Sequence, residues 1–202
     1  MTGKRTQSDK IKKMVLMALL TAVMVVLGYV NIPMPFGLSI TFNMIPVAIA
    51  GIAMGLWGGT AMGAVFGLIS FLQCFGILGF SGMGATLVSV APWWMSFLQR
   101  FGTRVLMGFC TALIYRTLGD RLPAGIRCGI AGFCSAFLNT LFFMSALVLL
   151  FGHTEYMQNA MAGRAFLAYL VGSVGINGLV EMLTATVLTG AIGVALKKAR
   201  MY

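Results

Sequence analysis

The Lys and Arg residues of this chain are concentrated in three short stretches that separate long apolar segments. Eleven of the fourteen cations lie there, at Lys4, Arg5, Lys10, Lys12, Lys13, Arg116, Arg121, Arg127, Lys197, Lys198 and Arg200. In membrane proteins such cationic stretches are retained on the cytoplasmic side. The pattern therefore predicts a chain that crosses a bilayer an even number of times, with N- and C-termini cytoplasmic.

The composition favours burial in lipid over a water-facing surface. Hydrophobic residues make up 59% of the 202 positions and charged residues 9%, and the mean hydropathy is +0.96. Such a chain cannot cover a soluble globule. The formal charge of +10 does not indicate nucleic-acid binding, because the cations lie at the ends of apolar segments. We expect a single domain over 1–202 in the lipid bilayer, with a basic cytoplasmic N-terminus at 1–13.

The lengths of the apolar segments set the expected number of helices. Met44–Leu72 would be ~44 Å long as one helix, against a hydrocarbon core of ~30 Å, so we expect a break at Trp57, Gly58 and Gly59. The run 165–196 is also too long, and its outer part is expected to bend before a spanning helix begins near Asn177. The predicted fold is all-α, a polytopic membrane bundle of six transmembrane helices near 14–30, 44–57, 59–72, 101–115, 128–151 and 177–196.

Residues 75–100 are expected to connect two of these helices on the outer side. Residues 75–99 carry no charged side chain and contain several glycines, Pro92, Trp93 and Trp94. Aromatic residues favour the membrane interface, and a loop this apolar is not expected to extend into water. We therefore predict an outer lid-like loop at 75–100, folded over the bundle or lying in the interface.

Few polar side chains interrupt the apolar segments, and each is costly in lipid unless it faces the protein interior or a cavity. The expected helix depths place them at similar levels, in the outer half of the membrane or near its middle. This predicts a cavity for a small polar molecule, with an arginine suited to a carboxylate and amides as donors and acceptors. The candidate substrate-binding residues are Thr41, Asn43, Gln73, Arg104, Asn139, Asn177 and Glu181.

Several of these side chains also have a structural interpretation. Asn139 and Asn177 are able to form hydrogen bonds between helices without any ligand. Glu181 and Arg104 are able to pair with each other inside the membrane. Arg100 fits an anchor that extends to the interface better than a ligand contact.

The glycines and cysteines of the apolar segments are expected to serve packing. Gly59, Gly63 and Gly67 recur at every fourth position, which lets another helix approach closely, within the bundle or from a partner. The four cysteines form no CxxC pair and the chain has one His, so no metal site is predicted. GxxxxGK[ST], HExxH and GxSxG motifs are also absent from the sequence, and we predict that the chain is not an enzyme.

Several motifs together resemble a known family. The run ITFNMIPV at 40–47 is followed by GLISFLQ at 67–73 and RVLMG at 104–108, and Ala18 and Ala22 form an AxxxA motif on the first helix. Nearly the whole chain resembles the substrate-binding S components of energy-coupling factor (ECF) vitamin transporters of prokaryotes, and it is most similar to the pantothenate type. One departure is Thr103, where the family pattern has a proline.

The resemblance implies a substrate-binding subunit that takes its vitamin from outside the cell. The alanines of the AxxxA motif would form the docking face for a transmembrane coupling subunit. Two cytoplasmic ATPases would use the ATP, so no cofactor is expected in this chain. The implied location is the prokaryotic plasma membrane, as a multi-pass protein. Pantothenate carries a carboxylate, hydroxyls and an amide, which matches the arginine and amide inventory.

Two other functions are compatible with the same residues. A stand-alone vitamin or small-solute facilitator would use the same cavity, and uptake by this chain alone in ATP-free vesicles would identify it. A non-transport membrane assembly protein would use the glycines for association only and would bind no small ligand saturably. The sequence likeness does not decide which vitamin is bound, because biotin and folate are anionic as well.

Overall fold

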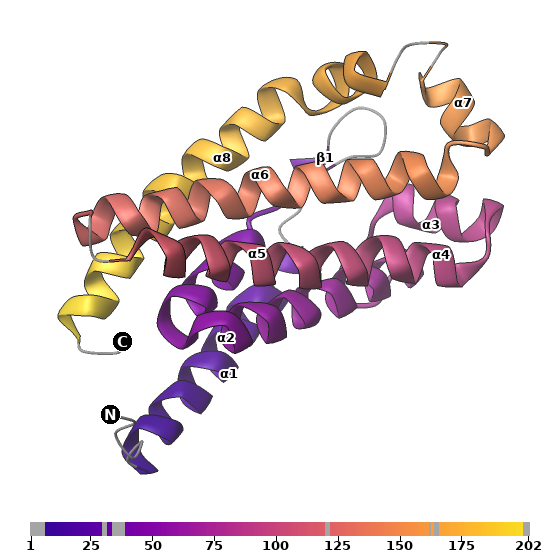
Figure 1. The fold of residues 1–202 in the computed structure, drawn as a ribbon. Coiled ribbons are helices and arrows are strands. Elements are labelled where there is room, and N and C mark those ends of the chain that lie inside the picture. The colour runs from indigo at the N-terminus through magenta and orange to yellow at the C-terminus, as the bar shows by residue number, and fades with distance from the viewer. Residues whose placement is uncertain are drawn as a thin grey trace.

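The long helices of the protein run side by side in one elongated bundle (Figure 1). The computed structural model describes residues 7–29, 32–33, 39–119, 122–161, 163 and 166–199, with side chains except at 8, 32–33, 39–40, 160, 166–171, 173–174 and 176–177. The first helix begins and the last helix ends at the same end of the bundle. That shared end is the arrangement expected when both termini lie on one side of a membrane.

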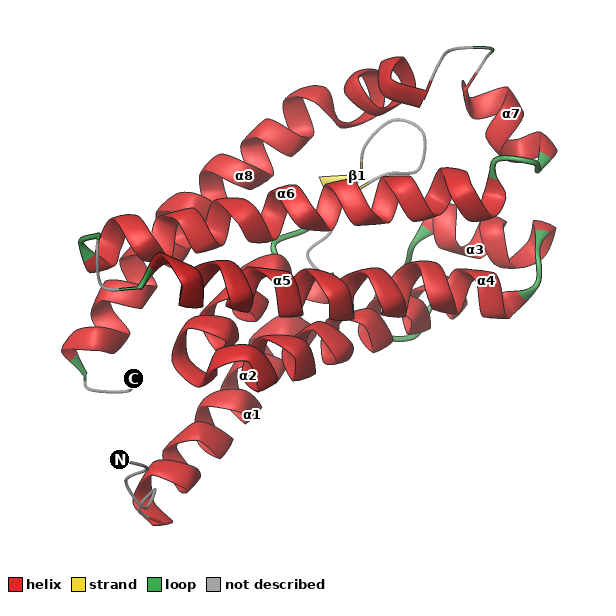
Figure 2. Ribbon diagram, viewed as in Figure 1, coloured by secondary structure: helices red, strands yellow, loops and turns green. Residues whose placement is uncertain are grey.

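Helices account for most of the described residues (Figure 2). The long helices are α1 (Gln7–Tyr29), α2 (Met44–Leu72), α5 (Thr103–Leu118), α6 (Ala124–Phe151) and α8 (Phe166–Lys198). The shorter elements are the 3-10 helix η2 (Gln73–Phe75), α3 (Gly82–Val90), α4 (Trp93–Phe97), the π-helix η3 (Leu98–Gly102) and α7 (Glu155–Met161). Strands β1 (Ile32–Pro33) and β2 (Ser39–Ile40) pair antiparallel, with Ile32 opposite Ile40.

Four helical stretches of the described chain are long and apolar enough to cross a membrane. They are Asp9–Tyr29, Met44–Phe75, Ala124–Phe151 and Gly178–Lys198. The helix α5 is shorter, but α4, η3 and α5 follow one another without interruption over 93–118. The prediction of an all-helical, multi-pass membrane fold is therefore confirmed at the level of fold class.

The break predicted in α2 lies at a different glycine. Gly55 has φ 73° and ψ −157°, which is not helical, while Gly58 and Gly59 continue the second half of the helix. A glycine adopts positive φ without the steric penalty of a Cβ atom. The predicted position at Trp57, Gly58 and Gly59 was thus wrong by a few residues, although the reason for expecting a break, excess length, holds.

The glycine series of α2 packs against η3 and α5. A Cβ atom at Gly59 would lie 2.6 Å from the carbonyl oxygen of Gly108, and one at Gly67 would lie 2.8 Å from Cα of Phe101. A Cβ atom at Gly63 would overlap with the carbonyl oxygen of Arg104. Small residues at this spacing allow close backbone approach, so the three glycines serve packing inside the bundle.

Residues 75–100 are more helical than the predicted loop. They contain α3, α4 and part of η3, joined by short bends. Met83 and Leu87 of α3 are buried in one apolar cluster with Leu147 and Phe151 of α6. This segment therefore packs against one end of the bundle through α6, and its role as a lid stays a prediction.

The last helix is also more continuous than predicted. α8 is helical from Phe166 to Lys198, although Figure 1 shows its first turns at an angle to the remainder.

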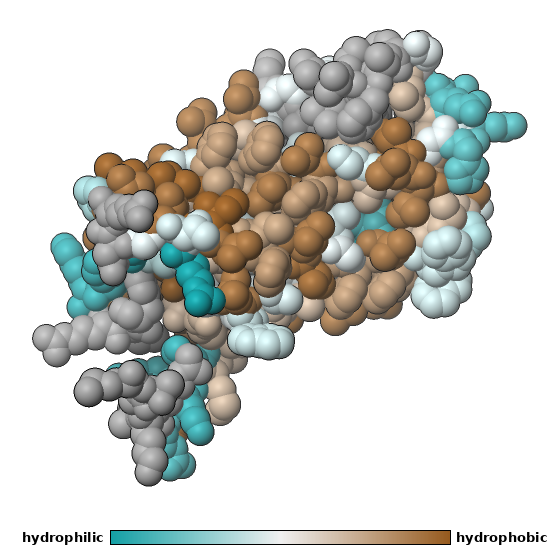
Figure 3. All heavy atoms as spheres, viewed as in Figure 1, coloured by the Kyte–Doolittle hydropathy of each residue, from teal (hydrophilic) through white to brown (hydrophobic). Residues whose placement is uncertain are grey.

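The outer surface of the bundle is apolar. Large apolar side chains such as Leu149 of α6 and Leu183 and Val187 of α8 are exposed. Figure 3 shows hydrophobic residues over the middle of the visible face and hydrophilic residues near its ends, as a protein surrounded by lipid requires.

Candidate functional site

Arg104 lies inside the bundle, between aromatic rings of two other helices. Its guanidinium carbon, Cζ, is 4.2 Å from the ring centre of Phe143 in α6 and 5.3 Å from that of Phe66 in α2. Arg104 is 6% exposed. Its Nη1 donates a 3.0 Å hydrogen bond to Oγ1 of Thr103, whereas its Nε has no partner. The ring faces stabilise the cation, while donors at the rim of the guanidinium suit a planar anion.

One face of α6 follows the same stretch of α5 towards this arginine. Ser135 Oγ lies 3.3 Å from Sδ of Met107, which is three residues after Arg104. Eight residues beyond Ser135, Phe143 contacts Arg104. Asn139 is one helical turn from each of the two α6 residues and therefore shares their face. Asn139 therefore lies on α6 between the contact of Ser135 with Met107 and the contact of Phe143 with Arg104.

The start of α2 and the middle of α8 reach the same region. The carbonyl of Met44 accepts a 3.0 Å hydrogen bond from Ser135 Oγ, and Asn43, which precedes it, is 1% exposed. The backbone N–H of Thr41 donates to Oε1 of Glu181 over 2.9 Å. Predicted site residues from α2, α5, α6 and α8 are thus brought together, although they are far apart in the sequence.

Glu181 and Arg104 do not satisfy each other. The two charges interact electrostatically, but no direct ion pair joins these two described side chains, and the contacts of the guanidinium are Thr103, Phe66 and Phe143. The interpretation of a self-contained intramembrane pair was therefore wrong. A buried guanidinium with an unpaired donor is costly unless another group compensates for its charge, which makes an anionic ligand favourable here.

Several buried side chains on the elements that adjoin Arg104 have polar atoms without a hydrogen-bond partner. In the described chain they include Oδ1 of Asn43, Oδ1 of Asn139 and both side-chain polar atoms of Gln99, Oε1 and Nε2. A buried polar group without a partner costs about 1–3 kcal/mol, so native proteins pair nearly all of them with protein, water or ligand. The amides and Arg104 together suit a small anion that also carries hydroxyl or amide hydrogens.

Gln99 was missed by the sequence analysis, which placed it at the end of an outer loop. It is 0% exposed and belongs to the π-helix η3. A wide helical turn of this kind has no clear signature in a single sequence. The available signal was an uncharged amide five positions before Arg104 and next to Arg100.

Gln73 makes protein contacts. Its Nε2 donates to the carbonyl oxygens of Gly28 and Leu78, both over 3.1 Å. These bonds tie the end of α1 to the bend that follows η2. Because both donor hydrogens of the amide are used within the protein, a substrate contact by Gln73 would be limited to its oxygen and stays a prediction.

Arg100 does not extend to the membrane interface as expected. It is 4% exposed, and its Nη1 donates to the carbonyl and the hydroxyl of Ser70 over 3.0 and 3.1 Å. Its Nη2 donates to Oγ of Ser81 over 3.0 Å, the residue at the N-cap of α3. The anchor interpretation was wrong because the two Nη atoms donate to hydroxyls and a carbonyl inside the protein, although Nε has no partner.

Three further predicted residues are Asn177, Ala18 and Ala22. The side chain of Asn177 lies outside the described residues, so its place in the site stays a prediction. Ala18 and Ala22 are both exposed on α1, whereas Leu16, Leu20 and Met24 form the buried side of the same helix. The AxxxA motif is therefore open to a partner, as the docking prediction requires.

A bundle of apolar helices around a buried arginine and unpaired amides is typical of a multi-pass membrane protein. Comparisons with known proteins agree with this class. The family model for the ECF transporter, substrate-specific component, matches residues 12–193. The chain belongs to this family, whose members are components of transporters and not enzymes.

Two relatives are similar over most of their length. The pantothenic acid transporter PanT of Lactococcus lactis subsp. cremoris is 30% identical over 207 residues, which cover 96% of this chain and 98% of the relative. The pantothenate transporter PanT of Leuconostoc mesenteroides subsp. mesenteroides is 26% identical over 171 residues, or 83% of this chain and 80% of the relative. The crystal structure of the S component for biotin from an ECF-type ABC transporter has a TM-score of 0.54 at 20% identity, covering 96% of this chain and 95% of that one. The last likeness supports the fold alone.

Proposed function

We propose that this chain is the high-affinity substrate-binding subunit of an ECF importer for pantothenate. The observation that carries the proposal is the guanidinium of Arg104, held between Phe66 and Phe143 beside unpaired buried amides. It would bind the carboxylate, and Asn43 and Asn139 would bind the hydroxyl and amide groups. Support comes from the two PanT relatives, because both are named as transporters of pantothenate.

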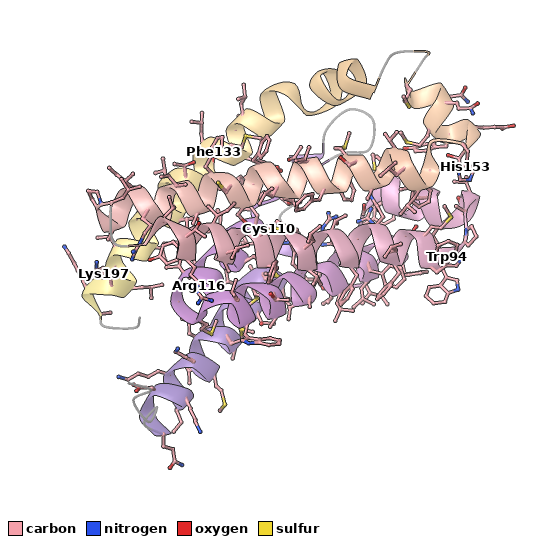
Figure 4. The ribbon with its side chains drawn as sticks, in the orientation of Figure 1. Trp94, Cys110, Arg116, Phe133, His153 and Lys197 are labelled. Atoms are coloured by element: carbon pink, nitrogen blue, oxygen red, sulfur yellow. The ribbon has the colours of Figure 1, made fainter. Side chains whose placement is uncertain are left out.

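The proposed membrane arrangement has six crossings and cytoplasmic termini. The crossings are α1, the two halves of α2 on either side of Gly55, the stretch 93–118, α6 and α8. Arg116 and Lys197 lie at one end of the bundle, and Trp94 and His153 lie at the other (Figure 4). The cationic end is proposed to be cytoplasmic; Trp94 and Arg104 would then lie in the outer half, and the ligand would enter from the outside.

The proposed partners are a transmembrane coupling subunit and two cytoplasmic ATPases in a prokaryotic plasma membrane. The exposed face of α1 with Ala18 and Ala22 would receive the coupling subunit, because small side chains permit close helix contact. Energy for release of the vitamin would come from ATP hydrolysis by the partners.

Titration calorimetry of the purified chain in detergent tests the proposal. Pantothenate should bind at one site per chain with a dissociation constant in the nanomolar range, whereas biotin, thiamine and folate should not compete at micromolar concentration. Uptake into vesicles should require the coupling subunit, the ATPases and ATP. Failure of pantothenate to bind, or uptake by this chain alone without ATP, would overturn the proposal.

A further inference from the structure

The inner face of the α4–η3 stretch carries a second group of unpaired polar atoms, next to Arg104 but not containing it. Ser96 and Gln99 are three residues apart and both are 0% exposed. Oγ of Ser96 and both Oε1 and Nε2 of Gln99 have no hydrogen-bond partner. Three orphan atoms on neighbouring buried residues destabilise the ligand-free protein, so a compensating group is expected when the protein functions.

The local backbone places Gln99 in this position. Leu98–Gly102 is π-helical, and the hydroxyl of Thr103 donates a hydrogen bond to the carbonyl of Gln99. The same hydroxyl accepts from Nη1 of Arg104. Single π-turns within α-helices occur often at functional sites. Thr103 thus links the backbone of Gln99 to the side chain of Arg104.

The spacing of Gln99 and Arg104 fits two ends of one ligand. They are five positions apart, which corresponds to at most roughly 7 Å along the helix axis at the α-helical rise. A ligand in which an amide joins a carboxylate-bearing unit to a hydroxylated acyl group resembles two amino-acid residues in length. Its carboxylate and the hydroxyl next to its amide are then about 7 Å apart when the ligand is extended. Asn139 is placed beside the same stretch on α6, with its own Oδ1 unpaired.

We propose that Ser96 and Gln99 determine specificity by binding the uncharged end of the ligand, its hydroxyl and amide groups, while Arg104 binds the carboxylate. This inference rests on the proposed function and adds the orientation of the ligand along α4–η3–α5. The site then selects an anion that has hydroxyl and amide groups at the far end, because an apolar anion of equal length would leave the Gln99 amide unpaired.

The test compares Gln99→Leu with wild-type protein, using pantothenate and its neutral alcohol analogue, pantothenol. Leucine has a similar size and removes both orphan atoms. We expect affinity for both compounds to fall about tenfold to a hundredfold and by the same factor, because both share the hydroxyl and amide end. The melting temperature of ligand-free Gln99→Leu should equal or exceed that of wild type. Ser96→Ala, a smaller change, should lower affinity for both compounds about threefold to tenfold.

Thr111→Val provides the matched control. Thr111 is a buried residue of α5 with an unpaired hydroxyl, seven residues beyond Arg104 towards the cytoplasmic end. Its replacement should leave both affinities unchanged. Unchanged pantothenate affinity in Gln99→Leu, or a lower melting temperature of this variant without ligand, overturns the inference and leaves the proposed function intact. If wild-type protein binds neither compound, the proposed function itself fails.

Discussion

Replacement of Arg104 by methionine separates its role in ligand binding from its role in folding. Arg104→Met keeps an unbranched side chain of similar length between Phe66 and Phe143, but removes the charge and all donors. Two hydrogen bonds from a charged donor to a carboxylate contribute about 1.5–3 kcal/mol each. Their loss, about 3–6 kcal/mol, corresponds to a hundredfold or greater decrease in pantothenate affinity, at about 1.4 kcal/mol per factor of ten.

The neutral analogue supplies the internal comparison. Pantothenol has a hydroxyl in place of the carboxylate, so it accepts at most weaker bonds from Arg104, and its affinity should fall by about tenfold or less. Arg116→Met is a matched control, because Arg116 is exposed at the other end of α5, and it should change neither affinity. Calorimetric titration of the three proteins with both compounds measures these values.

The ligand-free stability gives a second readout. Arg104 has no ion-pair partner in direct contact, so its replacement by methionine removes the desolvation cost of a buried charge, several kcal/mol. The replacement also loses two cation–ring contacts of about 1–2 kcal/mol each, which is no larger in sum. The melting temperature without ligand should therefore equal or exceed that of wild type. Equal affinity losses for the two compounds would refute the carboxylate role, and a clearly lower melting temperature would show that Arg104 is structural.

Other variants test the packing and the proposed docking face. Gly63→Val should destabilise the bundle by about 3 kcal/mol or more, because its side chain would overlap with the backbone of α5; unfolding in detergent measures this, and wild-type stability would contradict the close approach. Gln73→Leu should cost about 1–3 kcal/mol of stability, because it removes the two hydrogen bonds that the side-chain amide donates to the carbonyls of Gly28 and Leu78; a drop in affinity without loss of stability would instead indicate a ligand contact. Ala18→Trp should leave pantothenate affinity unchanged and abolish co-purification with the coupling subunit; an intact complex would place docking elsewhere.

The membrane class and the separate apolar helices could be predicted from the sequence because they depend on composition and segment length. The break in α2 was expected from length, but its position was not, since Gly55, Gly58 and Gly59 all tolerate unusual backbone angles and only tertiary packing distinguishes them. Gly59 must remain helical because it contacts α5.

The candidate site could be predicted where a polar residue interrupts an apolar run. Prediction was poorer where the role of a polar residue depends on its hydrogen-bond partners in the folded protein. Arg104, Asn43 and Asn139 were identified by that rule and lie in one region. Arg100 also interrupts an apolar run, yet its two Nη atoms donate to Ser70 and Ser81, and no single-sequence pattern reveals that pairing. Gln99 was missed because its burial depends on the π-turn of η3.

The exposed alanines of α1 and the polar residues of α5 and α6 belong to different helices. α1 packs mainly against α2, through Leu16, Leu20 and Met24 on the side away from Ala18. Substitutions that retune the interior for another nutrient would therefore leave the outward side of α1 unaltered. Relatives that bind different small molecules can in this way keep the same lipid-facing surface on their first helix.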